Sequence, residues 1–293
     1  RSSAASDVYK RQDVVPLDRN NRILVSQGLK RMRAGKMCHG IHALFAAARR
    51  DPRKAQPFDM GFALGPRLNA AGRLDDMSVG IACLLADNLE TAQSLAAELN
   101  SLNQARQEIE QGMLADILNS FPASLPPQQL TLCAYRDDFH QGVTGIVAGR
   151  LKERFYRPTF VFAPAGKGEI RGSGRSLPGL HLRDAVDMVS KRCPKLISRF
   201  GGHAMAAGLS MREDGLAEFE RVLEQVVSEL ADENLLSQTY LTDGSLDSSD
   251  LTLPVARELA RPVWGQGFPP PSFADEFSVL RQQRLGGDKQ HLK

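Results

Sequence analysis

The chain of 293 residues contains four cysteines, one tryptophan and almost no excess of charge of either sign. Its cysteines are far apart in the sequence and form no Cys-x-x-Cys pair, which argues against a disulfide framework and against a metal site built from cysteines. They indicate a reducing compartment, and we expect a cytoplasmic protein. No apolar run is long enough to span a bilayer, so we expect no membrane partner. A net charge of +3 permits nucleic-acid binding without requiring it, because local clusters of Lys and Arg decide such binding.

The rest of the composition is typical of a globular protein, with 42% hydrophobic and 24% charged residues. The length suffices for two domains and part of a third. Residues 1–12, RSSAASDVYKRQ, lack the apolar region of a signal peptide and resemble read-through of adapter sequence, so we exclude them from the fold. The last residues, 290–293, fall inside an expected strand, and both ends suggest a fragment.

A glycine-rich stretch, GGHAMAAG, occupies residues 201–208. Paired glycines allow a tight turn or a close approach to a ligand, and the small residues after them favour the start of a helix. The N-terminus of such a helix attracts an anion, to which His203 can add a hydrogen bond. A tight turn before a close-packed helix, with His203 as an ordinary polar residue, explains the stretch equally well.

A second stretch, GSGRS at residues 172–176, reads as a Gly/Ser loop that carries an arginine. The guanidinium of Arg175 can bind two phosphate oxygens at once. Together with Ser173 and His203, it predicts a phosphate pocket built from two glycine-rich loops.

The first third of the chain is helical in pattern. Residues 13–18 resemble the end of a strand, where Asp13 is either a metal ligand or a turn residue; the residues alone favour the turn. Helical patterns follow at residues 20–50 and 59–64.

The stretch GPRLNAAGRLDD, residues 65–76, places two arginines on either side of Asn69. A loop here can aim Arg67 and Arg73 at one run of phosphates. The alternative is a helix start, in which Asp75 or Asp76 caps a helix over residues 77–88. Both interpretations can hold together.

Residues 89–121 predict one long connecting helix, with an apolar stripe of Leu95, Leu99, Leu102 and Ile109. The loop 122–129 leads into a second domain whose strands alternate with helices. Strands are expected at 130–135, 158–165 and 169–173, and helices at 146–155, 182–190 and 216–230. This alternation predicts an α/β sandwich around a central sheet. After residue 232 the pattern favours strands and turns, typical of an incomplete small β-domain.

Taken together, the motifs resemble the RecJ family, the single-strand-specific 5′→3′ exonucleases of the DHH phosphoesterase superfamily. The resemblance runs from residue 13 to the C-terminus. It is carried by DVVPLD-x-NNR, GPRLNAAGRLDD, HQGVTGIVAGRLKERF, and GSGRS with GGHAMAAGLS, in this order. The later stretch WGQGFPPPSF matches the beginning of the oligonucleotide-binding (OB) barrel of that family.

The resemblance implies a domain plan: the C-terminal part of a DHH catalytic domain (13–88), a connecting helix (89–121), a DHH-associated nucleic-acid-binding domain (122–232) and an incomplete OB-type domain (233–293). It also implies two divalent metals, Mn²⁺ or Mg²⁺, and a single-stranded DNA substrate with a 5′ phosphate.

Site residues carry over from the same motifs. Asp13 matches a metal ligand and catalytic residue, and His203 lies in the GGH motif near the scissile bond. Ser173 and Arg175 match the phosphate pocket. Arg67, Asn69 and Arg73 match the nucleotide-contacting motif. We expect Arg67, Arg73 and Arg175 to line a groove that binds phosphates, with Arg150 or Lys152 as a further member. His140 lies in the HxGVxGIVA motif, where a structural role in the loop explains it about as well as a role in the site.

The chain departs from the family in one large respect, because it contains no DHH triplet. Asp13, the one aspartate that matches a metal ligand of the family, cannot by itself hold two hard cations. We therefore expect this fragment to be inactive, although its parent hydrolyses DNA in repair and recombination. Two other hypotheses stay open: a superfamily phosphodiesterase for short oligonucleotides or cyclic dinucleotides, and a non-catalytic single-strand-binding protein. We expect a monomer, with a helicase or a single-strand-binding protein as further partners.

Overall fold

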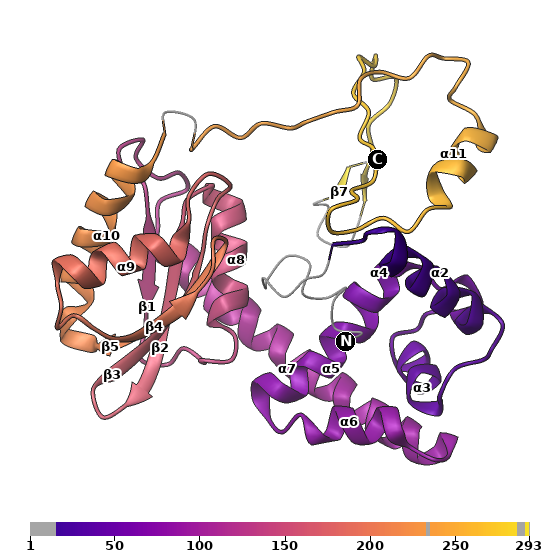
Figure 1. Cartoon of the computed structure of the whole chain (residues 1–293), viewed down its shortest axis with the longest axis horizontal. Coiled ribbons are helices and arrows are strands. Elements are labelled where there is room, and N and C mark those ends of the chain that lie inside the picture. The colour runs from indigo at the N-terminus through magenta and orange to yellow at the C-terminus, as the bar shows by residue number, and fades with distance from the viewer. Residues whose placement is uncertain (1–15, 233–234, 286–290, 293) are drawn as a thin grey trace.

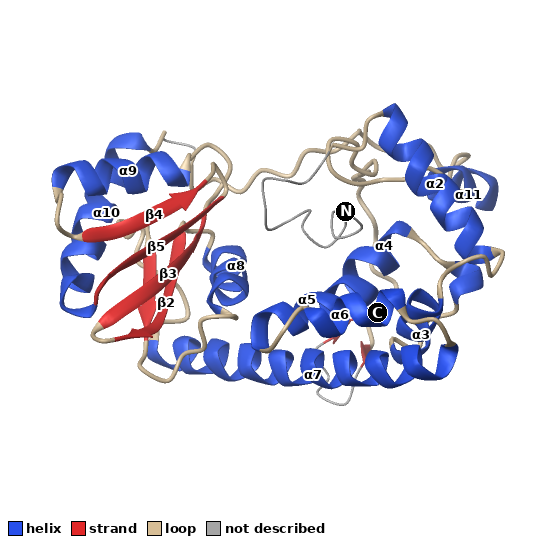
Figure 2. Ribbon diagram, turned by 60° about the horizontal axis from the view of Figure 1, so that its bottom comes forward, coloured by secondary structure: helices blue, strands red, loops and turns tan. Residues whose placement is uncertain are grey.

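The computed structural model describes residues 16–232, 235–285 and 291–292 (Figure 1). Expectations about residues 1–12 and about Asp13 fall outside the described residues. A helical unit and an α/β unit lie at opposite ends of one long helix, α7 (Leu89–Ser120), which Figure 2 shows passing beneath both. The mixed α/β fold class is confirmed.

Short helices at the first half of α7 form the helical unit, and α3, α5 and α6 pack directly against α7. They are α2 (Arg19–Arg33), α3 (His39–Ala47), α4 (Pro57–Asp59), α5 (Gly65–Leu74) and α6 (Ser78–Leu85), with a 3₁₀ turn at Pro52–Lys54 and a π-helical turn at Met60–Leu64. Asp18 starts α2 by accepting the Asn21 N–H at 2.8 Å. Leu44, Phe45 and Leu99 are fully buried in the core of this unit.

Residues 65–74 form a helix, so our prediction of a loop there is wrong. Pro66 lies in the first turn of α5, where proline is tolerated, and Gly72 is the one glycine among the following residues of the helix. Arg67 and Arg73 are six residues apart, about 240° around the helix, and therefore point in different directions. The capping prediction holds only in part: the N-cap of α6 is Met77, and the Asp76 carboxylate, one residue before it, accepts the Ser78 N–H at 2.9 Å.

The connecting helix is confirmed over Leu89–Ser120, about 48 Å long. Asn88 caps it by accepting the Thr91 N–H at 2.8 Å. Its buried stripe runs through Ala92, Ala96, Leu99, Asn103, Glu110, Met113 and Ile117. The spacing is three or four residues, except for seven between Asn103 and Glu110, where the largely buried Arg106 divides the step into three and four. The apolar ends of this stripe pack into two different cores, and its middle is polar.

A five-stranded sheet forms the α/β unit, in the order β1-β2-β3-β5-β4. Its strands are β1 (Leu132–Tyr135), β2 (Thr159–Gly166), β3 (Glu169–Arg175), β4 (Ile197–Gly202) and β5 (Ala206–Arg212). The β1–β2 pair is parallel and the other pairs are antiparallel.

Helices cover both faces of this sheet. Phe160 and Phe162 of β2 pack among α9 (Leu182–Arg192) and α10 (Leu216–Leu230). Val161 and Ala163, the alternate residues, pack with α8 (Thr144–Phe155) and the end of α7. The expected strands and helices of this unit are confirmed within a few residues.

The GSGRS stretch is not a loop, because residues 172–175 continue strand β3. Gly172 and Gly174 face the aromatic core: an added Cβ would lie 2.4 Å from the Phe162 ring and 2.5 Å from the Phe160 ring. These glycines therefore make room for phenylalanines, which the sequence alone does not distinguish from loop flexibility.

The expected helix after the GGH motif is also wrong. Residues 201–208 form the β4–β5 hairpin, closed by the His203 N–H donating to the Ala206 carbonyl at 2.7 Å. Gly202 has φ +144°, and a Cβ there would lie 2.4 Å from the Ala206 oxygen, so the prediction of a tight turn is confirmed. Without a helix, no helix N-terminus attracts an anion at this place.

The chain then returns along an arm that contains α11 (Leu253–Ala260) and reaches the helical unit (Figure 1). There the Leu17 N–H donates to the Gln266 carbonyl at 2.6 Å, and the Arg22 guanidinium lies 4.0 Å from the centre of the Phe268 ring. In this arm the described residues form strands only at β6 (Arg284–Leu285) and β7 (His291–Leu292).

After residue 232, where the sequence favours strands and turns, the described residues thus contain few strands, since a strand forms only where another pairs with it. Among the described residues, no helix combines the length and the apolar character needed to cross a membrane.

Gly174→Ala is expected to lower the free energy of unfolding by about 1–3 kcal/mol, because the new methyl group overlaps the Phe160 ring. Gly208→Ala on the neighbouring strand is the matched control. The nearest atom to its Cβ is 3.7 Å away, and the expected change is within about 0.5 kcal/mol. Urea unfolding of both variants measures the difference, and equal stabilities would contradict this packing.

Candidate nucleic-acid-binding groove

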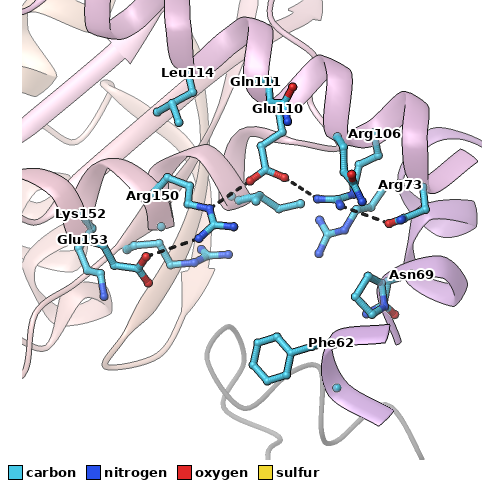
Figure 3. A pocket seen from close by; sticks show the side chains of 18 of the residues that line it. Phe62, Asn69, Arg73, Arg106, Glu110, Gln111, Leu114, Arg150, Lys152 and Glu153 are labelled. Carbon is cyan, nitrogen blue, oxygen red and sulfur yellow. Dashed lines mark hydrogen bonds and ion pairs between the residues drawn. The ribbon is translucent and has the colours of Figure 1, made fainter. Parts of the chain in front are cut away.

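A groove of about 560 Å³ lies where the helical unit, the middle of α7 and the α/β unit meet (Figure 3). Residues of η2 (Met60–Leu64) and α5 line one side, and α8 with the end of β3 lines the other. Five basic and two acidic side chains line it: Arg73, Arg106, Arg150, Lys152, Arg175, Glu110 and Glu153. The excess of positive charge suits a polyanion.

Arg175 lies at the β3 end of the groove. Its guanidinium rests against the first turn of α8, where a Cβ on Gly145 would lie only 2.8 Å from Nη2. Its Nη1 donates to the Gly174 carbonyl at 2.8 Å. A glycine at position 145 is thus needed to accommodate this arginine at the groove.

Ser173 lies on the same face of β3 as Arg175 but is not among the residues that line the groove. Its hydroxyl is 3.0 Å from the hydroxyl of Thr144, at the start of α8. This contact joins β3 to the first residue of α8.

His203 is exposed in the β4–β5 turn, and its side chain does not line the groove. Its carbonyl accepts the Arg183 N–H of α9 at 3.3 Å. Met205, two residues later, does line the groove, and Arg175 pairs with Ala206 in the sheet. Arg175 and His203 therefore share one end of the sheet without sharing a cavity wall.

Asn69 and Arg73 both line the groove, because they are four residues apart on α5 and share one face of it. Arg73 Nη1 donates to the Gly142 carbonyl at 3.0 Å, which links the helical unit to the α/β unit. The contact is close, since a Cβ on Gly142 would lie 2.2 Å from the Arg73 carbonyl oxygen. His140 Nδ1 accepts the Gly142 N–H at 3.1 Å, so His140 shapes this loop.

Arg67 points away from the groove. Its guanidinium donates to Asn100 Oδ1 at 3.0 Å, to the Ala63 carbonyl at 2.7 Å and to the Ala47 carbonyl at 3.5 Å. Burial lowers the pKa of this arginine. Its contacts tie α5 to α7 and α3, and its predicted contact with nucleic acid stays a prediction.

Sequence reasoning missed Arg106 and Glu110, which lie in the polar middle of the α7 stripe. Arg106 is held by Glu110 and by Asn103, and Glu110 also binds Arg150 of α8 (Figure 3). The available signal was the spacing: Asn103, Arg106 and Glu110 continue the three-and-four repeat of the apolar residues on either side.

The described residues do not by themselves fit a two-metal centre. Within residues 16–232, 235–285 and 291–292, no group of three or more His, Cys, Asp or Glu side chains could hold a metal ion. The groove instead offers guanidinium and amide groups, whose chemistry is the binding of phosphates.

Two family models match parts of this chain. The DHHA1 domain matches residues 128–229, and the RecJ OB domain matches residues 242–293. Among solved structures, RecJ from Thermus thermophilus superposes with a TM-score of 0.79 in complex with Mn²⁺ and 0.77 in complex with Mg²⁺, at 31% sequence identity. The Mn²⁺ comparison covers 98% of this chain and 41% of the solved one.

Curated relatives carry the name single-stranded-DNA-specific exonuclease RecJ. The chain is 52% identical to that of Salmonella typhimurium over 286 residues, and 52% identical to that of Escherichia coli over 289 residues. Each alignment covers 96% of this chain and 49% of the relative, so the chain spans about half the length of the relatives it matches. Sequence, domain models and fold agree: this chain belongs to the RecJ family.

Proposed function

We propose that this chain is the strand-holding part of a single-stranded-DNA-specific 5′→3′ exonuclease. The observation that carries the proposal is the basic groove with Arg175 at its β3 end. Arginines and a lysine along the groove neutralise successive phosphates, while Asn69 and Gln107 offer hydrogen bonds. The curated relatives, named for specificity toward single-stranded DNA, support this substrate.

Arg175 is the proposed site for the 5′ phosphate. Its planar guanidinium can donate two parallel hydrogen bonds to phosphate oxygens, and its seat against Gly145 fixes its orientation. Ser173, two residues before it on the same face of β3, contacts Thr144 at the start of α8 and stays a proposed residue of the same phosphate site. His203, on the nearby turn, stays a proposed residue of the catalytic region.

Hydrolysis by the full-length protein is proposed to use Mn²⁺ or Mg²⁺, as the metal complexes of Thermus RecJ suggest. Asp13 stays the proposed metal ligand of this chain. The proposed domain division remains 13–88, 89–121, 122–232 and 233–293. A cytoplasmic monomer that acts with a helicase or a single-strand-binding protein in DNA repair and recombination is part of the same proposal.

A second candidate, binding of single strands without hydrolysis, suits the chain as given. The described residues lack a metal-binding cluster, and the groove contains binding groups. We therefore propose that this chain binds single-stranded DNA but does not cleave it.

Arg175→Ala is expected to weaken binding of a 5′-phosphorylated single strand by about 1–3 kcal/mol, as for a charge-assisted contact, and to weaken binding of a 5′-hydroxyl strand less. Arg171→Ala is the matched control, since Arg171 lies on the same strand and face but outside the groove. Fluorescence anisotropy with strands labelled at the 3′ end measures both. Equal losses for the two strands in Arg175→Ala would show that the pocket assignment is wrong.

Incubation of the chain with a 5′-phosphorylated single strand and Mn²⁺ or Mg²⁺ is expected to release no mononucleotides above the level of an Asp13→Ala variant. One aspartate supplies too few oxygen ligands for two cations. Gel analysis of the labelled strand provides the measurement, with chelator-treated samples as the blank. Metal-dependent turnover that disappears in the variant would refute the expectation.

A further inference from the structure

We propose that Glu110 is a positioning residue, whose carboxylate holds Arg106 and Arg150 in place to bind the phosphates of the strand. The inference rests on the proposed function of the groove and names a residue outside the four motifs that led to it. Glu110 belongs to α7, Arg106 lies one turn before it, and Arg150 comes from α8 across the groove.

The contacts divide the carboxylate between the two arginines. Glu110 Oε2 is 2.5 Å from Arg106 Nη1, and Oε1 is 3.2 Å from Arg150 Nε (Figure 3). Arg106 Nη2 also donates to Asn103 Oδ1 at 3.2 Å. One carboxylate therefore fixes the direction of two guanidiniums from two different helices.

Burial separates this pair of contacts from an ordinary surface ion pair. The side chains of Glu110 and Arg106 are each 11% exposed, whereas that of Arg150 is 59% exposed. Removing two charged groups from water is costly and is offset only by good geometry. The three groups together carry one net positive charge at the groove, and Arg150 presents it outward.

The outward side of Arg150 can accept a phosphate. Its Nε edge is bound to Glu110, while Nη1 lies 3.9 Å from Glu153, whose side chain is 61% exposed. Such a long, exposed pair contributes little, so a phosphate can replace Glu153 as the partner of Nη1. Glu110 would then keep the arginine in place while the strand moves past it.

Two simple roles for Glu110 predict opposite effects on binding. If its carboxylate only subtracts charge from a basic groove, its neutralisation strengthens the attraction of DNA. If it orients Arg106 and Arg150, its neutralisation weakens binding, because a neutral amide keeps only one acceptor oxygen and can no longer hold both guanidiniums.

The test uses the 293-residue chain and a 5′-phosphorylated single-stranded oligonucleotide, with anisotropy titrations over a series of salt concentrations. Glu110→Gln is expected to raise Kd about tenfold. It is also expected to reduce the slope of log Kd against log salt by about 0.7, the value for a single strand of which one phosphate, that bound by Arg150, is no longer neutralised. Reduced folding alone would lower the active fraction and leave the slope unchanged.

Glu153→Gln is the matched control. It removes a negative charge beside the same Arg150 in the same groove, but from an exposed position, and is expected to leave Kd unchanged or lower it. Circular dichroism establishes that both variants are folded. If Glu110→Gln does not fold, Glu110→Asp takes its place: the charge stays, the shorter side chain cannot reach both arginines, and the same reduction of the slope is expected.

The outcomes separate this inference from the proposed function. If the unmodified chain does not bind the oligonucleotide, the proposed function fails first. If it binds and the Glu110 variant binds as tightly with an unchanged slope, only the positioning role is overturned.

Discussion

One buried stripe on α7 determines how the two units of this protein meet. The stripe repeats every three or four residues from Ala92 to Ile117, so a single face of the helix stays covered along its length. At its N-terminal end the stripe packs into the helical unit, and at its C-terminal end into the layer of α8 and the sheet. Between them the residues are polar, and there the two units leave a groove. A helix that is apolar at both ends and polar in the middle thus builds a binding site between two cores.

The polar middle of that stripe is better explained by binding than by stability. A buried ionic cluster such as Glu110 with Arg106 contributes little net stability, because desolvation offsets the attraction. Its contribution to binding is geometric, since the carboxylate orients the guanidiniums before a ligand binds. The Arg73–Gly142 hydrogen bond and the close seat of Arg175 on Gly145 act in the same way on the groove walls. The groove is therefore preorganised by contacts from all three of its sides.

Periodicity predicted most of the α/β unit and the connecting helix, because apolar alternation and helical spacing are local properties of the sequence. The glycine-rich stretches were harder. Gly172 and Gly174 accept aromatic rings from a neighbouring strand, and residues 201–208 turn within a hairpin; both depend on partners distant in the sequence. Residues 65–74 form a helix because the neighbouring helices bury its face, so Arg67 and Arg73 diverge.

The groove residues divide in the same way. Arg73 and Arg175 were predicted from motifs. The role of Glu110 depends on its contact with Arg150 of α8, which lies 40 residues away in the sequence. A polar residue in a helical stripe gives no sign of its partner until the partner helix is placed.

The most direct measurement is photocrosslinking of a 5′-phosphorylated single strand that carries 5-iodouracil, followed by mass spectrometry of the linked peptides. The account predicts links to the groove, on peptides that contain Phe62 or Met205. Links confined to α9 and α10, on the opposite face of the sheet, would contradict it.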